Sequence, residues 1–309
     1  MALSMQLRGG PGQSMRWRDV AELVRAPAAF TVPGDGLAGA AAAGFPYGLR
    51  TGLIPLSSAC LYWAGMALND YADRDLDRVE RPERPIPSGR VRPRQAIALA
   101  TGLSAAGLGL AAAAGGRPAL RVAVPLTATV WTYDLVAKST ATGPLVMAAA
   151  RGLDVLLGAG GRLRSAAWPA FTVAVHTAGV TGLSRGEVHG TSAAAGRLAT
   201  VATAAATVAA TVPRDGWAAT FRPPARNLAT VGAAVASAGV YAASVGRAQW
   251  AAACSPDAAT VRRATGTGIR GLIPLQAALT ARTGALAVAA GVLAAAPLAK
   301  LASKVVSAT

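Results

Sequence analysis

Charge is scarce in this sequence, and negative charge is the scarcest. Charged side chains make up 14% of the 309 residues, and Asp and Glu together number 14 against 30 Lys and Arg. A soluble domain usually carries about 25% charged residues. The mean hydropathy is +0.40, and long apolar stretches alternate with short charged ones. These features exclude an ordinary soluble domain and indicate a protein that crosses a membrane several times.

Cysteine and aromatic residues are also few. Cys60 and Cys254 cannot staple a fold of this size and match no metal-binding motif, so we expect both to be buried small apolar residues. Aromatic residues make up 5%, whereas Ala and Gly dominate the apolar stretches. Small residues let membrane helices approach closely, and the period-two alternation of a membrane β-barrel is missing. We therefore expect an all-α fold, a tight polytopic bundle of transmembrane helices.

Nine membrane spans of about 20 residues each can be placed on the chain. They cover roughly residues 22–44, 48–69, 95–114, 118–136, 142–160, 167–184, 194–212, 227–246 and 280–299. A re-entrant or half-buried helix near 268–279 is a further candidate. The N-terminal lead lacks the apolar segment of a cleavable signal peptide. We expect residues 1–17 to be disordered and residues 18–309 to form one transmembrane domain.

The basic residues predict an orientation. With the N-terminus in the cytoplasm, the cytoplasmic segments hold more Lys and Arg than the outer ones, as in a bacterial-type cytoplasmic membrane. This orientation places the charged segments 70–94, 134–141 and 184–197 on the cytoplasmic side. The net charge of +16 would suggest nucleic acid in a soluble protein. Here the basic residues are scattered between apolar spans, so we expect membrane lipid and anionic substrates as partners, and no nucleic acid.

One segment departs from the shortage of acids, NDYADRDLDRVERPERPIPSGR over residues 69–90. If the second span continues as a helix, Asp70, Asp73 and Asp77 share one face, with Asn69 one turn before Asp73. Three carboxylates on one face repel each other unless a cation lies among them. Mg²⁺ suits such a site, because it takes hard oxygen ligands and bridges to phosphates. The sequence therefore predicts a magnesium site at the end of the second span.

The loop that follows is rich in proline and arginine. Its prolines end the helix, and its guanidinium groups, on Arg81, Arg84 and Arg90, suit phosphate oxygens. The alternative is a solvated loop of internal ion pairs, Asp70–Arg74 and Asp77–Arg81, each worth a few tenths of a kcal/mol. The combination of spacing, helix end and basic loop favours the metal site.

The acidic segment also carries a resemblance to a known family. NDYADRDLD (69–77) matches the NDxxDxxxD motif of the UbiA superfamily of intramembrane prenyltransferases, the 4-hydroxybenzoate polyprenyltransferase-like enzymes, and RPERPIPSG (81–89) resembles the loop after it. The resemblance covers residues 18–300. RAPAAFTVPGDGLAG (25–39) and GLIPLQAALTARTG (271–284) look most like the branch associated with ebo operons.

The resemblance implies nine helices around a central cavity and transfer of an isoprenoid chain from a polyprenyl diphosphate to an acceptor. It implies Mg²⁺ as cofactor, held by Asn69, Asp70, Asp73 and Asp77, with Arg81 and Arg84 on the diphosphate. Loss of diphosphate would leave an allylic cation that the acceptor captures. The donor's length, the acceptor and the bond type are not specified by the sequence.

The family's second aspartate-rich motif is altered here. After the sixth span, TGLSRGEVHG (181–190) offers only Glu187, with Ser184 where an Asp is expected. The resemblance implies that Glu187 ligates a metal as a catalytic residue while Arg185 meets phosphate directly; an Arg–Glu pair is the alternative. Lys138, in YDLVAK (133–138), is expected to bind diphosphate, with a simple membrane anchor as its alternative.

Two ionisable residues lie within the fifth span. Arg151 and Asp154 are costly at such depth and are candidates for contact with the acceptor or the cavity. Because they are three residues apart, we favour their neutralising each other over a direct part in catalysis. Asp35 either ends the first span or lines the cavity.

These patterns favour a Mg²⁺-dependent prenyltransferase over two other readings. An alcohol phosphotransferase would need a DG…AR motif leading into GxxxDxxxD, which neither Asp35-Gly36 nor Asp215-Gly216 provides. A non-catalytic protein that binds or transports isoprenoid lipid is the alternative that the reduced second motif leaves open.

Overall fold

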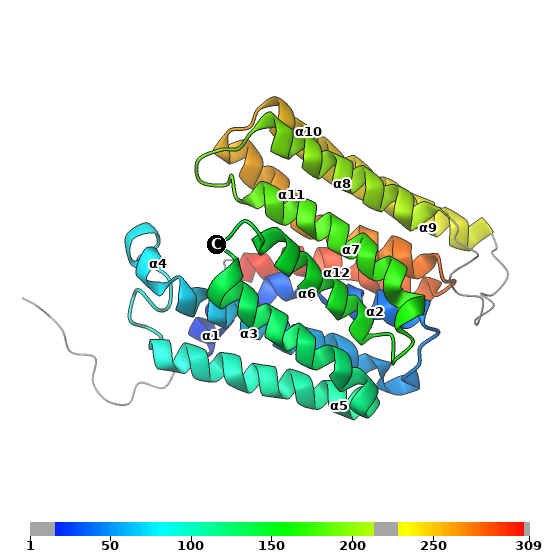
Figure 1. The fold of residues 1–309 in the computed structure, drawn as a ribbon, viewed down its shortest axis with the longest axis horizontal. Helices are drawn as coiled ribbons and strands as arrows, with labels where there is room; N and C mark the ends of the chain where they lie inside the picture. Colours follow the sequence, from blue (N-terminus) through cyan, green and yellow to red (C-terminus); the bar gives the residue numbers. More distant parts are fainter. Residues whose placement is uncertain (1–15, 213–227, 306–309) are drawn as a thin grey trace, which may run out of the picture.

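A computed structural model describes residues 16–212 and 228–305 of the chain. The lead predicted to be disordered, residues 1–17, lies almost wholly outside the described residues. The regular elements of the described part are all helical (Figure 1). They are α1 (Trp17–Leu23), α2 (Pro33–Ala42), α3 (Leu53–Ala72), α4 (Arg74–Glu80), α5 (Pro93–Thr132), α6 (Gly143–Leu157), α7 (Leu163–Ser184), α8 (Ala193–Thr211), α9 (Leu228–Tyr241), α10 (Arg247–Cys254), α11 (Ala258–Ala281) and α12 (Leu286–Val305).

Short tighter or wider turns join some of these helices. Ala26–Thr31 and Gly48–Gly52 form 3₁₀ turns, and Tyr133–Ala137 and Ala242–Gly246 form π turns that extend α5 and α9. Four continuous stretches are long and apolar enough to cross a membrane: Gly48–Ala72, Pro93–Ala137, Ala193–Thr211 and Leu228–Cys254. The all-α membrane bundle expected from composition is confirmed.

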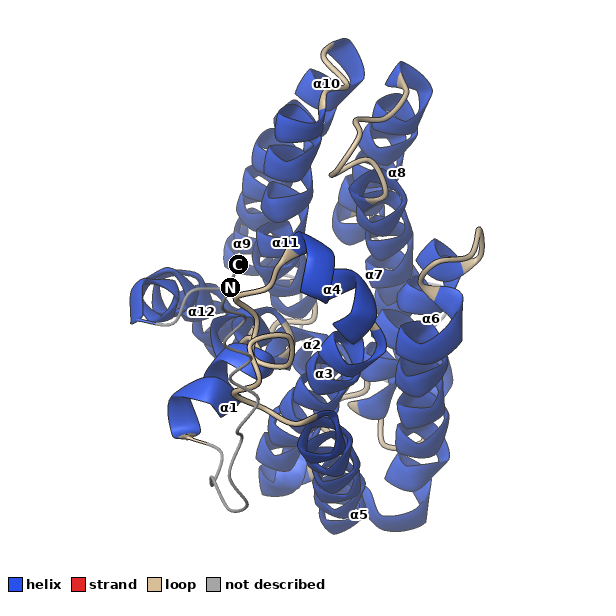
Figure 2. Ribbon diagram, turned by 90° about the vertical axis from the view of Figure 1, so that its left-hand side faces the viewer, coloured by secondary structure: helices blue, strands red, loops and turns tan. Residues whose placement is uncertain are grey.

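The helices pack as neighbours along the chain. Helix α3 lies along α5, α6 packs on α7, α7 on α8, and α9 and α12 both pack on α11. Figure 1 shows α8 and α9 along one edge of the bundle and α5 along the opposite edge, and Figure 2 shows the same bundle turned by 90°.

Small residues bring α2 and α6 into backbone contact. A Cβ atom on Gly39 would overlap the carbonyl group of Val155, and one on Gly158 would overlap that of Gly36. Such close approach is what glycine provides at membrane helix interfaces. It places the polar residues of α2 and α6 within bonding distance inside the bundle.

The spans predicted at 95–114 and 118–136 correspond to the two helical halves of α5, which are separated by a kink at Gly116, where φ of 58° and ψ of −139° are non-helical. The Trp131 indole group of the second half donates to the Ser104 hydroxyl group of the first half at 3.1 Å, so the two halves lie side by side.

Two expectations about the elements need correction. The half-buried helix near 268–279 is part of the 24-residue α11, which begins where the side chain of Asp257 accepts a hydrogen bond from the Thr260 amide. Cys254 is exposed rather than buried, because it ends α10 at the edge of the bundle, and Cys60 is partly exposed.

Candidate active site

Several connections between helices meet at one end of the bundle. Lys138 Nζ lies 2.6 Å from Asp73 Oδ1, which joins the loop after α5 to the acidic segment. Arg185 donates to the carbonyl oxygen of Thr140 at 2.5 Å, and Arg262 to that of Glu187 at 2.7 Å. The three charged segments 70–94, 134–141 and 184–197 therefore lie together, with the start of α11 beside them.

The acidic motif spans a break between two helices. Helix α3 ends at Ala72 and α4 begins at Arg74, with Asp73 between them at φ −87° and ψ 1°. Asp70 and Asp77 are buried, with 4% and 2% of their surface exposed, whereas the Asp73 side chain is 28% exposed. The helix predicted to continue through the motif is interrupted, and Asp73 is the most accessible of its three carboxylates.

Arginines from outside α3 and α4 neutralise the buried carboxylates. Arg84 Nη1 lies 2.6 Å from Asp77 and 3.5 Å from Asp70, and it is itself buried. Arg25 Nη2 lies 3.1 Å from Asp70 and 3.4 Å from the Asn69 amide oxygen. Asp70 thus has two cationic partners that are distant in the sequence.

The local ion pairs considered as an alternative are wrong. Arg74 does not pair with Asp70; it donates to the carbonyl oxygen of Tyr71 and lies 3.6 Å from Asp75. Asp77 pairs with Arg84 and not with Arg81. The reason is that the proline-rich loop after α4 folds back over the motif. Arg84 of this loop therefore reaches the buried carboxylates of Asp70 and Asp77.

Arg90, the last arginine of the proline-rich loop, anchors this loop to α1. Arg90 lies 2.8 Å from Asp19 and 2.6 Å from Glu22 of α1. The hydrogen bonds that Arg90 donates to Glu22 and Asp19 raise the pKa of its guanidinium group above the usual value. Arg90 was expected to suit phosphate, but its guanidinium group is occupied by α1 and by the carbonyl oxygen of Glu83.

Sequence reasoning missed two residues of this cluster. Arg25 lies just before the first span, in a left-handed backbone conformation with φ of 46°. Asp134 is buried, and its carboxylate accepts from the Asn69 amide at 3.5 Å. The signals available were weak: Arg25 opens the RAPAAF segment, and Asp134 lies within YDLVAK four residues before Lys138.

The altered second motif faces the arginine-rich loop. Glu187 is half-buried in the α7–α8 connection, where burial raises the pKa of its carboxyl group against the opposing charges of Arg262 and Arg81. Arg81 is close enough to Glu187 for its positive charge to favour the ionised carboxylate. Arg185 donates to the Thr140 carbonyl group rather than forming the Arg–Glu pair considered as an alternative.

The donor atoms of the first motif suit a hard divalent cation. Within the described ranges, no group of three or more His, Cys, Asp or Glu side chains is already gathered around a single point. Asn69, Asp70 and Asp73 nonetheless offer the oxygens that Mg²⁺ prefers, with Asp73 about one helical turn after the adjacent Asn69 and Asp70. Their charges are balanced by Arg25, Arg84 and Lys138, so the residues present fit a Mg²⁺ ion bound beside cationic groups.

Arg151 and Asp154 belong to a separate buried cluster. Arg151 Nη2 lies 2.8 Å from Asp35 and donates to the carbonyl oxygen of Thr31 at 3.0 Å. Asp154 accepts a hydrogen bond of 2.5 Å from the Ser58 hydroxyl group. The expected mutual neutralisation of Arg151 and Asp154 is therefore wrong, because α2 supplies the partner of Arg151.

This second cluster lies far from the acidic motif. Ser58 precedes Asp70 by twelve positions on α3, which is about 18 Å along the axis at 1.5 Å per residue. Gln276 of α11 completes the cluster by donating to Asp35 at 2.7 Å. The structure thus separates the predicted site residues into two groups. The acidic motif and its cationic partners form a charged group at one end of the bundle, which we call the mouth. The cluster around Asp35, Arg151 and Asp154 lies deeper in the bundle.

Comparison with known proteins gives a consistent result. Residues 28–261 match the UbiA prenyltransferase family. Digeranylgeranylglyceryl phosphate synthase from Methanopyrus kandleri is 41% identical over 88 residues, which span 28% of this chain and 32% of the relative's length.

Two solved structures share the fold. The apo structure of a UbiA homolog from Aeropyrum pernix K1 has a TM-score of 0.64 and 22% identity, over 81% of this chain and 96% of that one. A UbiA homolog from Archaeoglobus fulgidus bound to GPP and Mg²⁺ has a TM-score of 0.50 and 12% identity, over 81% and 99%.

Proposed function

The chain belongs to the UbiA prenyltransferase family, and from this premise we propose that it transfers an isoprenoid chain from a polyprenyl diphosphate to an acceptor. The observation that carries the proposal is the mouth of the bundle, where Asp70 and Asp73 meet Arg25, Arg84 and Lys138 at 2.6–3.5 Å. Carboxylates for a metal and cations for a diphosphate are both needed for this chemistry, and the mouth holds both.

Mg²⁺ would be held by Asp70 and Asp73, with Asn69 as a neutral ligand. The ion would supply charge stabilisation for the departing diphosphate. The bound structure of the Archaeoglobus homolog, which contains GPP and Mg²⁺, supports this choice of cofactor. Asp77 is a further predicted ligand of the ion. In the pairing described above, Asp77 holds Arg84 beside Asp70. Glu187 is the corresponding predicted ligand on the opposite loop.

The cations around the motif would bind the diphosphate. Lys138 and Arg84 already lie at the carboxylates, and Arg81 and Arg185 lie on the two facing loops. Fixed positive groups stabilise the charge that develops as the carbon–oxygen bond breaks and its electron pair leaves with the diphosphate. The acceptor then donates an electron pair to the allylic carbon and loses a proton, and an apolar bundle keeps water away from the cation.

The deeper cluster has a different role in this proposal. The acceptor must meet the carbon next to the diphosphate, whereas Ser58, the hydrogen-bond partner of Asp154, lies about 18 Å from Asp70 along α3. We place Arg151 and Asp154 in the wall beside the isoprenoid chain, where they hold α2, α6 and α11 together. The protein is a multi-pass membrane protein, and we propose that the N-terminus and the mouth face the cytoplasm of a bacterial-type cell, following the basic residues.

Diphosphate release tests the proposal. Purified protein in nanodiscs is given farnesyl or geranylgeranyl diphosphate with Mg²⁺ and a cell extract as acceptor source. We expect release that needs Mg²⁺ and falls at least about a hundredfold in Asp70→Asn and Asp73→Asn, as for loss of a strong electrostatic contact. Asp75→Asn is the matched control, because Asp75 is in the same segment but is exposed and pairs with Arg78 on the surface.

Other outcomes would redirect the proposal. Tight donor binding without release would indicate a non-catalytic isoprenoid-binding or transport protein. Absence of any donor binding would leave the acidic segment as an ion-paired loop. Glu187→Gln tells whether the single acid of the second motif still contributes, since a loss comparable to that of Asp73→Asn would place it on the metal.

A further inference from the structure

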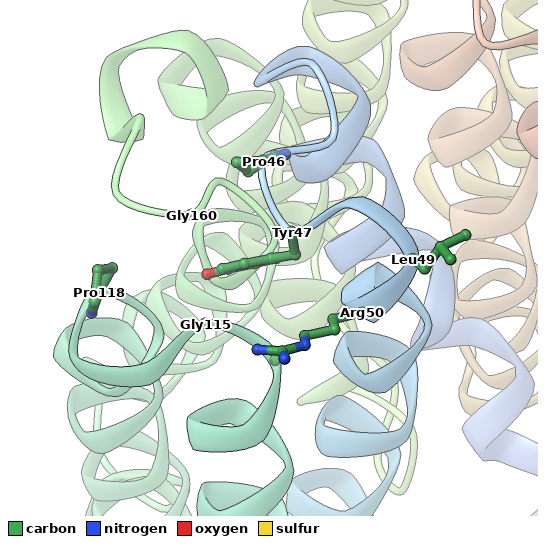
Figure 3. A pocket seen from close by; sticks show the side chains of 8 residues that line it. Pro46, Tyr47, Leu49, Arg50, Gly115, Pro118 and Gly160 are labelled. Atoms are coloured by element: carbon green, nitrogen blue, oxygen red, sulfur yellow. The ribbon is translucent and has the colours of Figure 1, made fainter.

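A pocket opens at the end of the bundle opposite the acidic motif. It has a volume of about 640 Å³ and lies between the α2–α3 connection, the bend of α5 and the α6–α7 connection. Figure 3 shows Tyr47 and Arg50 extending side by side toward the bend at Gly115 and Pro118, with Gly160 beside them. This end is remote from the mouth, because α3 separates Gly48–Gly52 from the motif by its whole length.

Glycines in left-handed conformations shape the pocket. The three connections that border it turn at Gly48, Gly116 and Gly160, whose φ values are 55°, 58° and 56°. A side chain on Gly115 would overlap the Tyr47 ring, which is fixed by a hydrogen bond of 3.1 Å from its hydroxyl group to the Leu157 carbonyl oxygen. The wall is therefore built by packing, and one charged side chain is left to face the space.

That side chain, Arg50, has no protein partner among the described residues. Its guanidinium group makes no hydrogen bond or ion pair with the described part of the chain, and it is exposed to the pocket. Arginine presents five donors in a planar fork that matches phosphate oxygens. An unpaired arginine in a pocket at the surface of a membrane bundle is suited to bind an anion.

The surroundings have only one sign of charge. In the described segments 44–52, 112–121 and 158–165 the charged residues are all arginines: Arg50, Arg117, Arg121, Arg162 and Arg164. The acidic residues that the structure describes lie outside these three segments. Such a basic concentration at the membrane surface attracts anionic lipid, each residue contributing about fivefold in affinity.

The rim adds an apolar element. Leu49, next to Arg50, is fully exposed at 103% of its reference surface, and Leu56, on the first turns of α3, is exposed at 54%. Exposed leucines beside an exposed arginine suit a molecule that has both a phosphate group and acyl chains. A free phosphate has no apolar part that could contact the leucines.

We propose that this pocket binds the phosphate head group of an anionic membrane lipid. Arg50 contacts the phosphate, the nearby arginines add attraction, and the acyl chains follow the bundle past Leu49. The site is independent of the transfer reaction, because it involves none of the residues at the mouth.

Native mass spectrometry of the full chain in detergent tests the site. Dioleoylphosphatidylglycerol and dioleoylphosphatidylcholine are titrated separately, and glycerol phosphate is added as a competitor. We expect the anionic lipid to bind at least about fivefold more tightly than the zwitterionic one. Arg50→Gln should remove that preference, and Arg50→Lys, which keeps the charge and loses the fork, should retain part of it.

Arg94→Gln is the matched control, since Arg94 is an exposed arginine in the first turn of α5, far along that helix from the bend that borders the pocket. Equal binding of the two lipids, or an equal loss in Arg94→Gln and Arg50→Gln, would overturn the assignment in favour of unspecific surface charge. Displacement of the lipid by millimolar glycerol phosphate would overturn the lipid as occupant and indicate a site for a free phosphate compound. Because Arg50 is exposed, each variant is expected to fold, and circular dichroism verifies it.

Discussion

Removing one member of the buried Asp35–Arg151 pair is expected to destabilise the bundle strongly. Asp35 is fully buried, and its carboxylate lies 2.8 Å from the Arg151 guanidinium group. Arg151→Met keeps much of the aliphatic volume but leaves a buried carboxylate with Gln276 as its hydrogen-bond partner. Breaking a buried pair in this way costs about 3–5 kcal/mol, a large share of the roughly 5–15 kcal/mol by which proteins are stable.

The free energy of unfolding can be measured by SDS titration in micelles of fixed composition. Arg78→Met is the control, because it removes an exposed pair with Asp75, whose side chains are 63% and 66% exposed, and should cost about 0–1 kcal/mol. The double variant Asp35→Asn/Arg151→Met removes both charges while an asparagine oxygen can still accept from Gln276. We expect it to be more stable than Arg151→Met alone.

Two results would refute this reasoning. One is a loss in Arg151→Met no larger than in Arg78→Met. The other is a double variant that is no more stable than Arg151→Met, since the cost would then not arise from an uncompensated charge. Diphosphate release by the folded variants adds a second readout: loss of activity at unchanged stability would place Arg151 in contact with substrate.

Three further predictions concern the mouth and the helix packing. Arg84→Met should weaken donor binding by about tenfold or more, because it removes a buried cation that reaches two carboxylates; equilibrium binding of labelled donor measures this, and unchanged affinity would contradict it. Gly158→Val should destabilise by about 1–3 kcal/mol through overlap with the backbone of α2, whereas Gly109→Ala, with nothing within 4 Å of its Cβ, should be neutral or stabilising in thermal unfolding. Burial raises the pKa of the Glu187 carboxyl group from its ordinary 4.5, so the folded state binds the carboxyl proton more tightly than the unfolded state does. The stability that this proton contributes is lost as the pH rises through the raised pKa. The melting temperature of Glu187→Gln should therefore rise relative to that of the wild type between pH 4.5 and 7, and a difference that stays constant over this range would contradict the prediction.

The acidic motif and Lys138 could be predicted because their information is local. Asn69, Asp70 and Asp73 follow one another at helical spacing, and Lys138 ends a span in a chain with few charges. Their partners could not be predicted, because Arg25 is 45 residues from Asp70 and meets it only through tertiary packing. The same holds for Asp35, which is paired by a residue of α6.

The error over α11 has a different origin. Arg262, Arg263 and Arg270 lie within it, and their charge lowers its apolar character below that of a typical span. In the structure the helix is nevertheless continuous and lies mostly inside the bundle, with Leu272, Leu275 and Leu279 buried. Hydropathy measures the preference of a helix for lipid, so it fails where a helix is surrounded by other helices.

Residues 26–31, between α1 and α2, are held by α11 and α12. Gln276 of α11 donates to the Thr31 carbonyl oxygen at 2.8 Å across 245 residues, and α12 packs on residues 26–31. That segment follows directly on Arg25, which reaches Asp70. A ribosome delivers Arg25 to the translocon long before α11 and α12 are made, so a growing chain carries its acidic motif without the support that positions its arginine. Nascent chains that end before α11 would therefore lack the contacts that hold residues 26–31 and, next to them, Arg25.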